Sequence, residues 1–277
     1  MGLKFPRTSR LFPLLFIYSH SLLAAGPIAY TDVGQGTPLL LIHAFPADQQ
    51  LWEPQQNALK AHFRVITLDL RGFGESAPVD GQAIGMTDYA DEVKALLDQL
   101  HIDKAIIGGE SMGGYIALAF LEKYPQHVEG LILSNTQSIA DNQETKAKRE
   151  SSAQDILENG TAGFIQGFLP KALSANTSEQ NKAFLLGMLN HQSAPAMASA
   201  LRGMALRDDR SDTLANTSLP VLIITSDEDK LIPPLQSKNM HKLARNSKLV
   251  TLADAGHLSN LEQPALWNQA VEKMFYK

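Results

Sequence analysis

The stretch AIIGGESMGGYIALAFL, residues 105–121, places a serine between a short strand and a helix. Its first three residues are an apolar run typical of a buried strand, and Tyr115–Leu121 have the composition of a helix. Ser111 lies at the turn between them, in the pattern Gly109-Glu-Ser-Met-Gly113. A serine on so sharp a turn needs small neighbours, because larger side chains would clash there. The turn would expose the Ser111 hydroxyl and leave the Met112 amide at the helix start free to bind an oxyanion.

The sequence on both sides of this stretch alternates apolar runs with amphipathic segments. A helix is predicted over residues 88–100, where apolar side chains recur at helical spacing, and another is predicted to begin at Pro264. The runs predicted as strands are residues 28–31, 39–42, 64–68, 128–133, 221–225 and 248–252. This alternation predicts the α/β class: a mostly parallel, doubly wound sheet with helices on both faces.

Two parts of the chain depart from this alternation. Residues 137–216 contain helix-like segments and no evident strand, which predicts a helical insertion between two strands. Residues 1–25 combine Lys4, Arg7 and Arg10 with an apolar run, the pattern of a signal peptide, although an N-terminal tail is the alternative. A signal peptide would make the protein periplasmic or secreted, whereas a start-site artefact would leave it cytoplasmic. The apolar run is short for a bilayer, so we expect no stable membrane span, and residues 26–277 form the predicted domain.

The composition narrows the function classes. The 277 residues carry a net charge of −5, which disfavours nucleic acid as a partner. The chain has no cysteine, which excludes disulfides and thiol catalysis. Neither metal-ligand spacing nor a nucleotide-binding glycine motif occurs, so no metal or cofactor is expected. The oligomeric state stays open.

A serine hydroxyl needs a base, which is usually a histidine held by a carboxylate. His257 follows the last predicted strand, and Asp229 follows the strand at residues 221–225. The order Ser, Asp, His is typical of the α/β-hydrolase fold, and open α/β sheets place their sites at the carboxyl ends of strands. Asp227 is the alternative acid.

The loop His43-Ala-Phe-Pro46 follows a buried strand and could supply a second oxyanion donor, the Phe45 amide. Residues 69–76 follow the next predicted strand and are expected to form a structural turn with a charge network.

Taken together, these segments resemble the small esterases and lactonases of the α/β-hydrolase fold. That group includes 3-oxoadipate enol-lactonase-like proteins, pimeloyl-carrier-protein methyl esterases and cofactor-free haloperoxidase-like esterases. The resemblance extends from about residue 28 to residue 275. It implies that Ser111 is the nucleophile, His257 the base and Asp229 the carboxylate that orients the histidine. It also implies that Phe45 and Met112 are the oxyanion donors. Residues 137–216 would then form a cap over the active site.

The chain departs from the family pattern at two positions. Ala44 stands where the family usually has glycine, and alanine has a narrower backbone range. Glu110 stands before the nucleophile, where a neutral or imidazole side chain is frequent, so a carboxylate there could alter the basicity of His257.

These expectations lead to a serine hydrolase acting through an acyl-enzyme on a small, largely uncharged ester, thioester or lactone. The alternatives are a C–C bond hydrolase or lyase, a catalytically silent ligand-binding protein, and a protein anchored by its N-terminus for contact with a partner. Eight residues could line an apolar acyl pocket, and packing in the hydrophobic core is the alternative for each of them. They are Trp52, Phe164, Phe168, Leu169, Leu173, Met188, Met197 and Met204.

Overall fold

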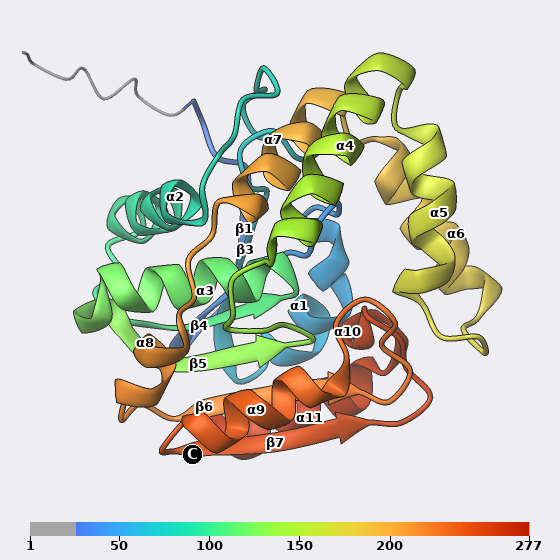
Figure 1. Cartoon of the computed structure of the whole chain (residues 1–277). Helices are drawn as coiled ribbons and strands as arrows, with labels where there is room; N and C mark the ends of the chain where they lie inside the picture. Colours follow the sequence, from blue (N-terminus) through green and yellow to red (C-terminus); the bar gives the residue numbers. More distant parts are fainter. Residues whose placement is uncertain (1–25, 277) are drawn as a thin grey trace, which may run out of the picture.

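Seven strands form one sheet in the computed structural model, which describes residues 26–276 (Figure 1). The predicted signal peptide lies outside the described residues and stays a prediction. Along the sheet the order is β1-β3-β2-β4-β5-β6-β7, in which β1 runs antiparallel to β3 and all other neighbours are parallel. The strands are β1 (Tyr30–Gly34), β2 (Thr37–Ile42), β3 (Phe63–Leu68), β4 (Ala105–Glu110), β5 (Val128–Ser134), β6 (Val221–Ser226) and β7 (Ser247–Leu252). The predicted fold class is confirmed.

The apolar run in β2 is continuous because the sheet is covered on both faces. Successive side chains of a strand point to opposite faces. Leu39 and Leu41 accordingly belong to one hydrophobic cluster, and Leu40 and Ile42 belong to the other. All four side chains are fully buried. This strand ends directly below the loop that begins at His43.

Helices pack on each face of the sheet. The face of Leu39 is covered by α1 (Glu53–Leu59) and α11 (Pro264–Phe275). The other face is covered by α2 (Met86–Gln99), α3 (Met112–Lys123) and α9 (Pro234–Leu243). Trp52, at the end of the short helix η1 (Gln49–Trp52), is fully buried against Trp267 of α11, with ring centroids 5.3 Å apart. The expectation that Trp52 could line a pocket is therefore wrong, because its ring completes the core between two helices.

Helices fill the long connection between β5 and β6. They are α4 (Gln143–Asn159), α5 (Ala162–Ala172), α6 (Glu179–Asn190), α7 (Ala194–Ala205) and α8 (Ser211–Asn216). Figure 1 shows α4 to α7 gathered above the sheet, with α4 and α7 side by side. Among residues 26–276, no helix combines the length and hydrophobicity needed to cross a membrane.

A third hydrophobic cluster fixes α5 and α6 over the ends of the strands. Ile165 of α5 and Leu185 of α6 pack there with Ala44, which follows β2, and with Leu258, which follows β7. The helical insertion therefore rests on the loops that the sequence predicts to carry the site.

Candidate active site

The turn that holds Ser111 has a backbone conformation that few residues adopt. Ser111 has φ +54° and ψ −112° between β4 and α3. A Cβ atom added at Gly113 would lie 2.1 Å from the carbonyl oxygen of Ile42, and one at Gly109 would lie 2.0 Å from the carbonyl carbon of Gly113. Neither contact is possible for a real side chain, so the glycines allow α3 to start this close to β2 and β4. A strained serine between such glycines is typical of a site where the hydroxyl must be held in place.

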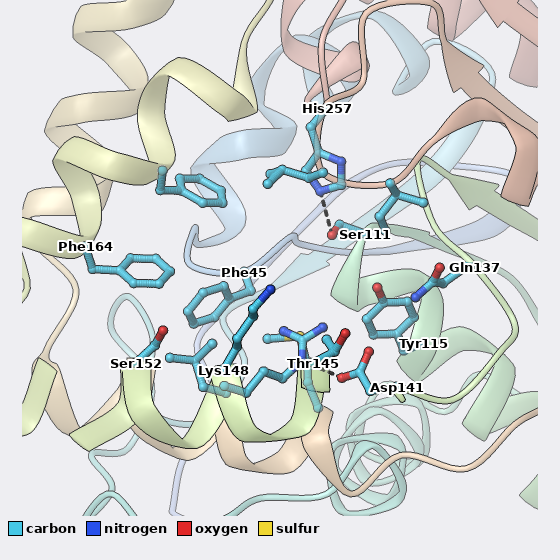
Figure 2. A pocket seen from close by; sticks show the side chains of 16 residues that line it. Phe45, Ser111, Tyr115, Gln137, Asp141, Thr145, Lys148, Ser152, Phe164 and His257 are labelled. Carbon is cyan, nitrogen blue, oxygen red and sulfur yellow. Dashed lines mark hydrogen bonds and ion pairs between the residues drawn. The ribbon is translucent and has the colours of Figure 1, made fainter. Parts of the chain in front are cut away.

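Ser111, His257 and Asp229 are brought together at this turn. Figure 2 shows the His257 ring directed at the Ser111 hydroxyl. The His257 Nε2 atom lies 2.7 Å from the Ser111 Oγ atom, and the His257 Nδ1 atom lies 2.9 Å from the Asp229 Oδ2 atom. Because a carboxylate only accepts, Nδ1 carries the proton and Nε2 is free to accept from the serine hydroxyl. All three residues are buried. The arrangement can therefore withdraw a proton from Ser111.

The Asp229 carboxylate is held by four hydrogen bonds. Oδ1 accepts from the amides of Leu231 and Ile232, and Oδ2 accepts from His257 and from the Asn135 amide. Burial alone would raise the pKa of Asp229, but His257 and these hydrogen bonds outweigh it and hold the pKa below its ordinary value. The alternative acid, Asp227, is exposed on the same loop. Asp229 is thus the carboxylate that faces the imidazole, and it stays charged.

Three polar side chains that the sequence did not single out support this carboxylate. Asn135, directly after β5, donates from Nδ2 to Asp229 and to the Ser226 hydroxyl at 2.7 Å, and its Oδ1 accepts from Ser259 at 2.6 Å. Ser226 in turn donates to the carbonyl of Gly256, beside His257. The signal that could have revealed Asn135 is its position at the carboxyl end of a predicted central strand.

The two expected oxyanion donors have no competing partner. Within residues 26–276, neither the Phe45 nor the Met112 amide donates a hydrogen bond to another protein group. The loop of Phe45 is fixed by His43, which donates from Nδ1 to the Ala44 carbonyl at 2.9 Å and accepts at Nε2 from the Leu70 amide at 3.1 Å. Ala44 does not adopt a positive φ, so this loop does not require the family's usual glycine.

Glu110 lies fully buried beneath the nucleophile turn, at the end of β4. Burial raises the pKa of Glu110 well above its ordinary value, and the Ser134 hydroxyl offsets this only in part. Within the described residues neither carboxyl oxygen has a well-formed hydrogen bond, so the contact with Ser134 is a weak one. The uncharged form of Glu110 is therefore favoured. This argues against the expectation that a charged Glu110 carboxylate alters the basicity of His257.

The turn at residues 69–76 joins several loops. Asp69 accepts from the amides of Gln49 and Glu75, and its carbonyl accepts from the Ser76 hydroxyl. Arg71 pairs with the buried Glu92 of α2. These are the structural turn and charge network that the sequence predicts.

A cavity of about 410 Å³ opens beside Ser111 and His257. Of the residues expected to line an apolar pocket, Phe164, Phe168 and Met204 do so. Leu169, Leu173, Met188 and Met197 instead pack in the hydrophobic clusters. The remaining lining residues are Phe45, Tyr115, Gln137, Asp141, Thr145, Lys148, Arg149, Ser152, Leu201, Leu231 and Ile232. Within residues 26–276, no three histidine or carboxylate side chains are grouped as metal ligands would be.

Known proteins share this architecture over most of the chain. A protein from Bacillus subtilis described as an AB hydrolase superfamily protein is 31% identical, over 87% of this chain and 92% of its own. The 3-oxoadipate enol-lactonase 1 of Acinetobacter baylyi is 28% identical, over 82% and 84%. The structure of a thermophilic esterase from Thermogutta terrifontis has a TM-score of 0.87 and 34% identity, over 89% and 92%. The model of the α/β-hydrolase-fold family matches residues 37–264, and this chain belongs to that family.

Proposed function

We propose that the protein is a serine hydrolase that cleaves a carboxylic ester, thioester or lactone through an acyl-enzyme. One observation carries the proposal: the Ser111 hydroxyl, the His257 imidazole and the Asp229 carboxylate form an unbroken chain of hydrogen bonds at the wall of a cavity. In this proposal Ser111 is the nucleophile, His257 the general base and Asp229 the residue that orients the imidazole. The similarity to an esterase and an enol-lactonase supports this class of substrate.

The reaction takes place in two steps. First, the Ser111 oxygen bonds to the carbonyl carbon while its proton passes to His257 Nε2, and the departing alkoxide or thiolate takes that proton as its bond to carbon breaks. Water then loses a proton to Nε2 and attacks the acyl carbon. The bond from carbon to Ser111 breaks, and the proton returns to the serine oxygen.

The Phe45 and Met112 amides would stabilise the oxyanion formed in each step. Both are free of protein acceptors in the described part of the chain. Fixed N–H donors of this kind lower the barrier by about 3 kcal/mol each.

In the same proposal α4 to α7 act as a cap over the active site, because α4, α5 and α7 contribute side chains to the cavity beside Ser111.

The test compares Ser111→Ala with Ser151→Ala, which removes an exposed hydroxyl on α4. We expect Ser111→Ala to lose nearly all turnover of a short 4-nitrophenyl ester and all labelling by a fluorophosphonate, with unchanged circular dichroism. The control variant should keep both. Unchanged turnover in Ser111→Ala would contradict the assignment. A labelled wild-type enzyme that hydrolyses no ester, thioester or lactone would instead favour the C–C hydrolase alternative, to be assayed with a β-diketone.

A further inference from the structure

Helix α4 turns a polar face toward the cavity. Thr145, Lys148, Arg149 and Ser152 all line it, at the spacing i, i+3, i+4 and i+7 that defines one side of a helix. That side of a helix covering a cavity is ordinarily apolar, because it faces away from water. Figure 2 shows Lys148 extending from α4 into the space between this helix and the Ser111–His257 pair.

The wall nearer the loop after β2 is aromatic. Phe45 and Phe164 lie edge to face with ring centroids 5.7 Å apart, and Phe164 stacks on Phe168 at 5.9 Å. The cavity is therefore divided into an apolar part, formed by these rings, and a polar part beside α4.

The polar part contains positive charge in excess. The Asp141 carboxylate lies between two guanidinium groups: the Arg149 Nε atom is 2.5 Å and the Arg207 Nη1 atom 2.7 Å from its Oδ2 atom. Burial alone would raise the pKa of Asp141, but the hydrogen bonds from both arginines outweigh it and hold the pKa below its ordinary value. Arg207 also lies 4.2 Å from the centre of the Tyr115 ring. One carboxylate thus balances only one of two largely buried cations.

Two cationic groups remain available to a ligand. Arg149 bonds Asp141 through Nε and approaches the Met204 sulfur through Nη1, and its Nη2 makes no hydrogen bond to another residue within the range 26–276. Among residues 26–276, the Lys148 Nζ atom is held only by Glu144, in an ion pair whose side chains are both 73% exposed. An exposed pair of this kind contributes little and exchanges readily.

We infer that the substrate is an ester or lactone bearing a carboxylate away from the scissile bond, and that Arg149 and Lys148 bind this carboxylate. The inference rests on the proposed function and names its substrate class. The apolar part of the substrate would contact the three phenylalanine rings, while its charged end would lie against α4. Charge-assisted hydrogen bonds to a guanidinium are among the stronger polar contacts in proteins.

The test uses two esters of equal chain length, mono-4-nitrophenyl octanedioate and 4-nitrophenyl octanoate, of which the first has a terminal carboxylate where the second has a methyl group. The measured quantity is kcat/KM for the octanedioate ester divided by kcat/KM for the octanoate ester. It is compared among the wild type, Lys148→Gln and Arg149→Gln. We expect this ratio to fall about tenfold in Arg149→Gln and severalfold in Lys148→Gln. Lys146→Gln is the matched control, because it removes the same charge from α4 at a residue that does not line the cavity. This variant should leave the ratio unchanged.

A second measurement separates this inference from the proposed function. Monomethyl octanedioate is titrated calorimetrically into Ser111→Ala, with and without Lys148→Gln, so that binding is read without turnover. Weaker binding in the double variant supports the carboxylate site even if no ester is hydrolysed. Equal binding, together with an unchanged ratio in Lys148→Gln, would overturn the inference while leaving the role of Ser111 intact. Lys148 is exposed, so its replacement is not expected to disturb folding, and this variant decides the matter if Arg149→Gln does not fold.

Discussion

Asn135 bonds the Oδ2 atom of the Asp229 carboxylate, whereas the Leu231 and Ile232 amides bond Oδ1. Replacing Asn135 with alanine removes one hydrogen bond to the carboxylate and the links to Ser226 and Ser259. A hydrogen bond to a charged group is worth about 1.5–3 kcal/mol, so we expect kcat to fall about 10- to 100-fold with KM little changed. The measurement is steady-state kinetics across pH, because a misplaced acid also shifts the acidic limb of the profile.

The control for this variant is Asn246→Ala, which removes an exposed side chain whose one hydrogen bond within the described residues is to the Ser218 carbonyl. Its kinetics should match the wild type. If Asn135→Ala loses thermal stability but keeps the kcat and pH profile of the wild type, then Asn135 supports the fold and not the orientation of Asp229.

Residues with strong local signals were predictable from the sequence, and residues that act through a partner were not. Ser111 is marked by flanking glycines, and His257 and Asp229 by their places after predicted strands. Asn135 also follows a predicted strand, but its position alone does not reveal its role, because that role depends on β5 and β6 pairing so that it meets Ser226. Sequence spacing cannot show a contact between residues 91 positions apart.

At the scale of elements, the start of α3 against β2 tolerates no added atom. In Gly113→Ala the new methyl group would meet the Ile42 carbonyl at 2.1 Å, which is backbone and cannot turn aside. We expect a loss of about 3 kcal/mol or more in the free energy of unfolding, measured with urea. The matched change is Gly167→Ala in α5, where an added Cβ meets nothing within 4 Å.

Gly167→Ala should raise the free energy of unfolding by roughly 0.5–1 kcal/mol, since alanine loses less backbone freedom in a helix. Similar stability of the two variants would show that α3 can shift away from β2. The serine turn would then not depend on the close approach of helix and strand.

The strands were predicted with small errors at their ends, for physical reasons. β1 begins at Tyr30 rather than Ile28, because pairing with β3 sets its limits. β4 continues through two glycines to Glu110, although glycine is unfavourable in strands, because neighbouring strands and α3 approach too closely for side chains there. Tertiary contacts, and not local propensity, fix both boundaries.

For the molecule as a whole, the fold class followed from the alternation of strands and helices, but the character of the cavity did not. The sequence led us to expect a largely uncharged substrate, since apolar side chains in the insertion were the visible feature. The polar face of α4 becomes meaningful only once the helix is placed over Ser111, with Lys148 and Arg149 lining the cavity. The cationic wall now favours a charged substrate.

The stability of the whole molecule should depend on pH in a way that buried carboxyl groups determine. Asp141 and Asp229 have lowered pKa values, so their stabilising effect is present above the ordinary value of 3.8 and is lost as the pH falls below it. Glu110 and Glu92 have raised pKa values, that of Glu92 reaching about 7, because burial disfavours their charged forms. Their contribution is present below 4.5 and is lost as the pH rises through the folded-state pKa.

For these carboxyl groups the two trends favour the folded state most near pH 4–5, with a decline toward pH 7 of up to about 1.4 kcal/mol per pH unit for each raised group. Burial lowers the pKa of His43 below its ordinary value of 6.5, so its contribution is lost as the pH falls below 6.5 and opposes part of this decline. Thermal unfolding from pH 3 to pH 8 checks this. Glu110→Gln removes one titrating group and keeps an uncharged side chain of the same shape, so it should flatten the decline above pH 4.5. Glu129→Gln, at an exposed position on β5, should retain the wild-type profile. Parallel curves for the wild type and Glu110→Gln above pH 4.5 would mean that the Glu110 carboxyl ionises in the folded protein as it does in water, and that the nucleophile turn lies over a charge.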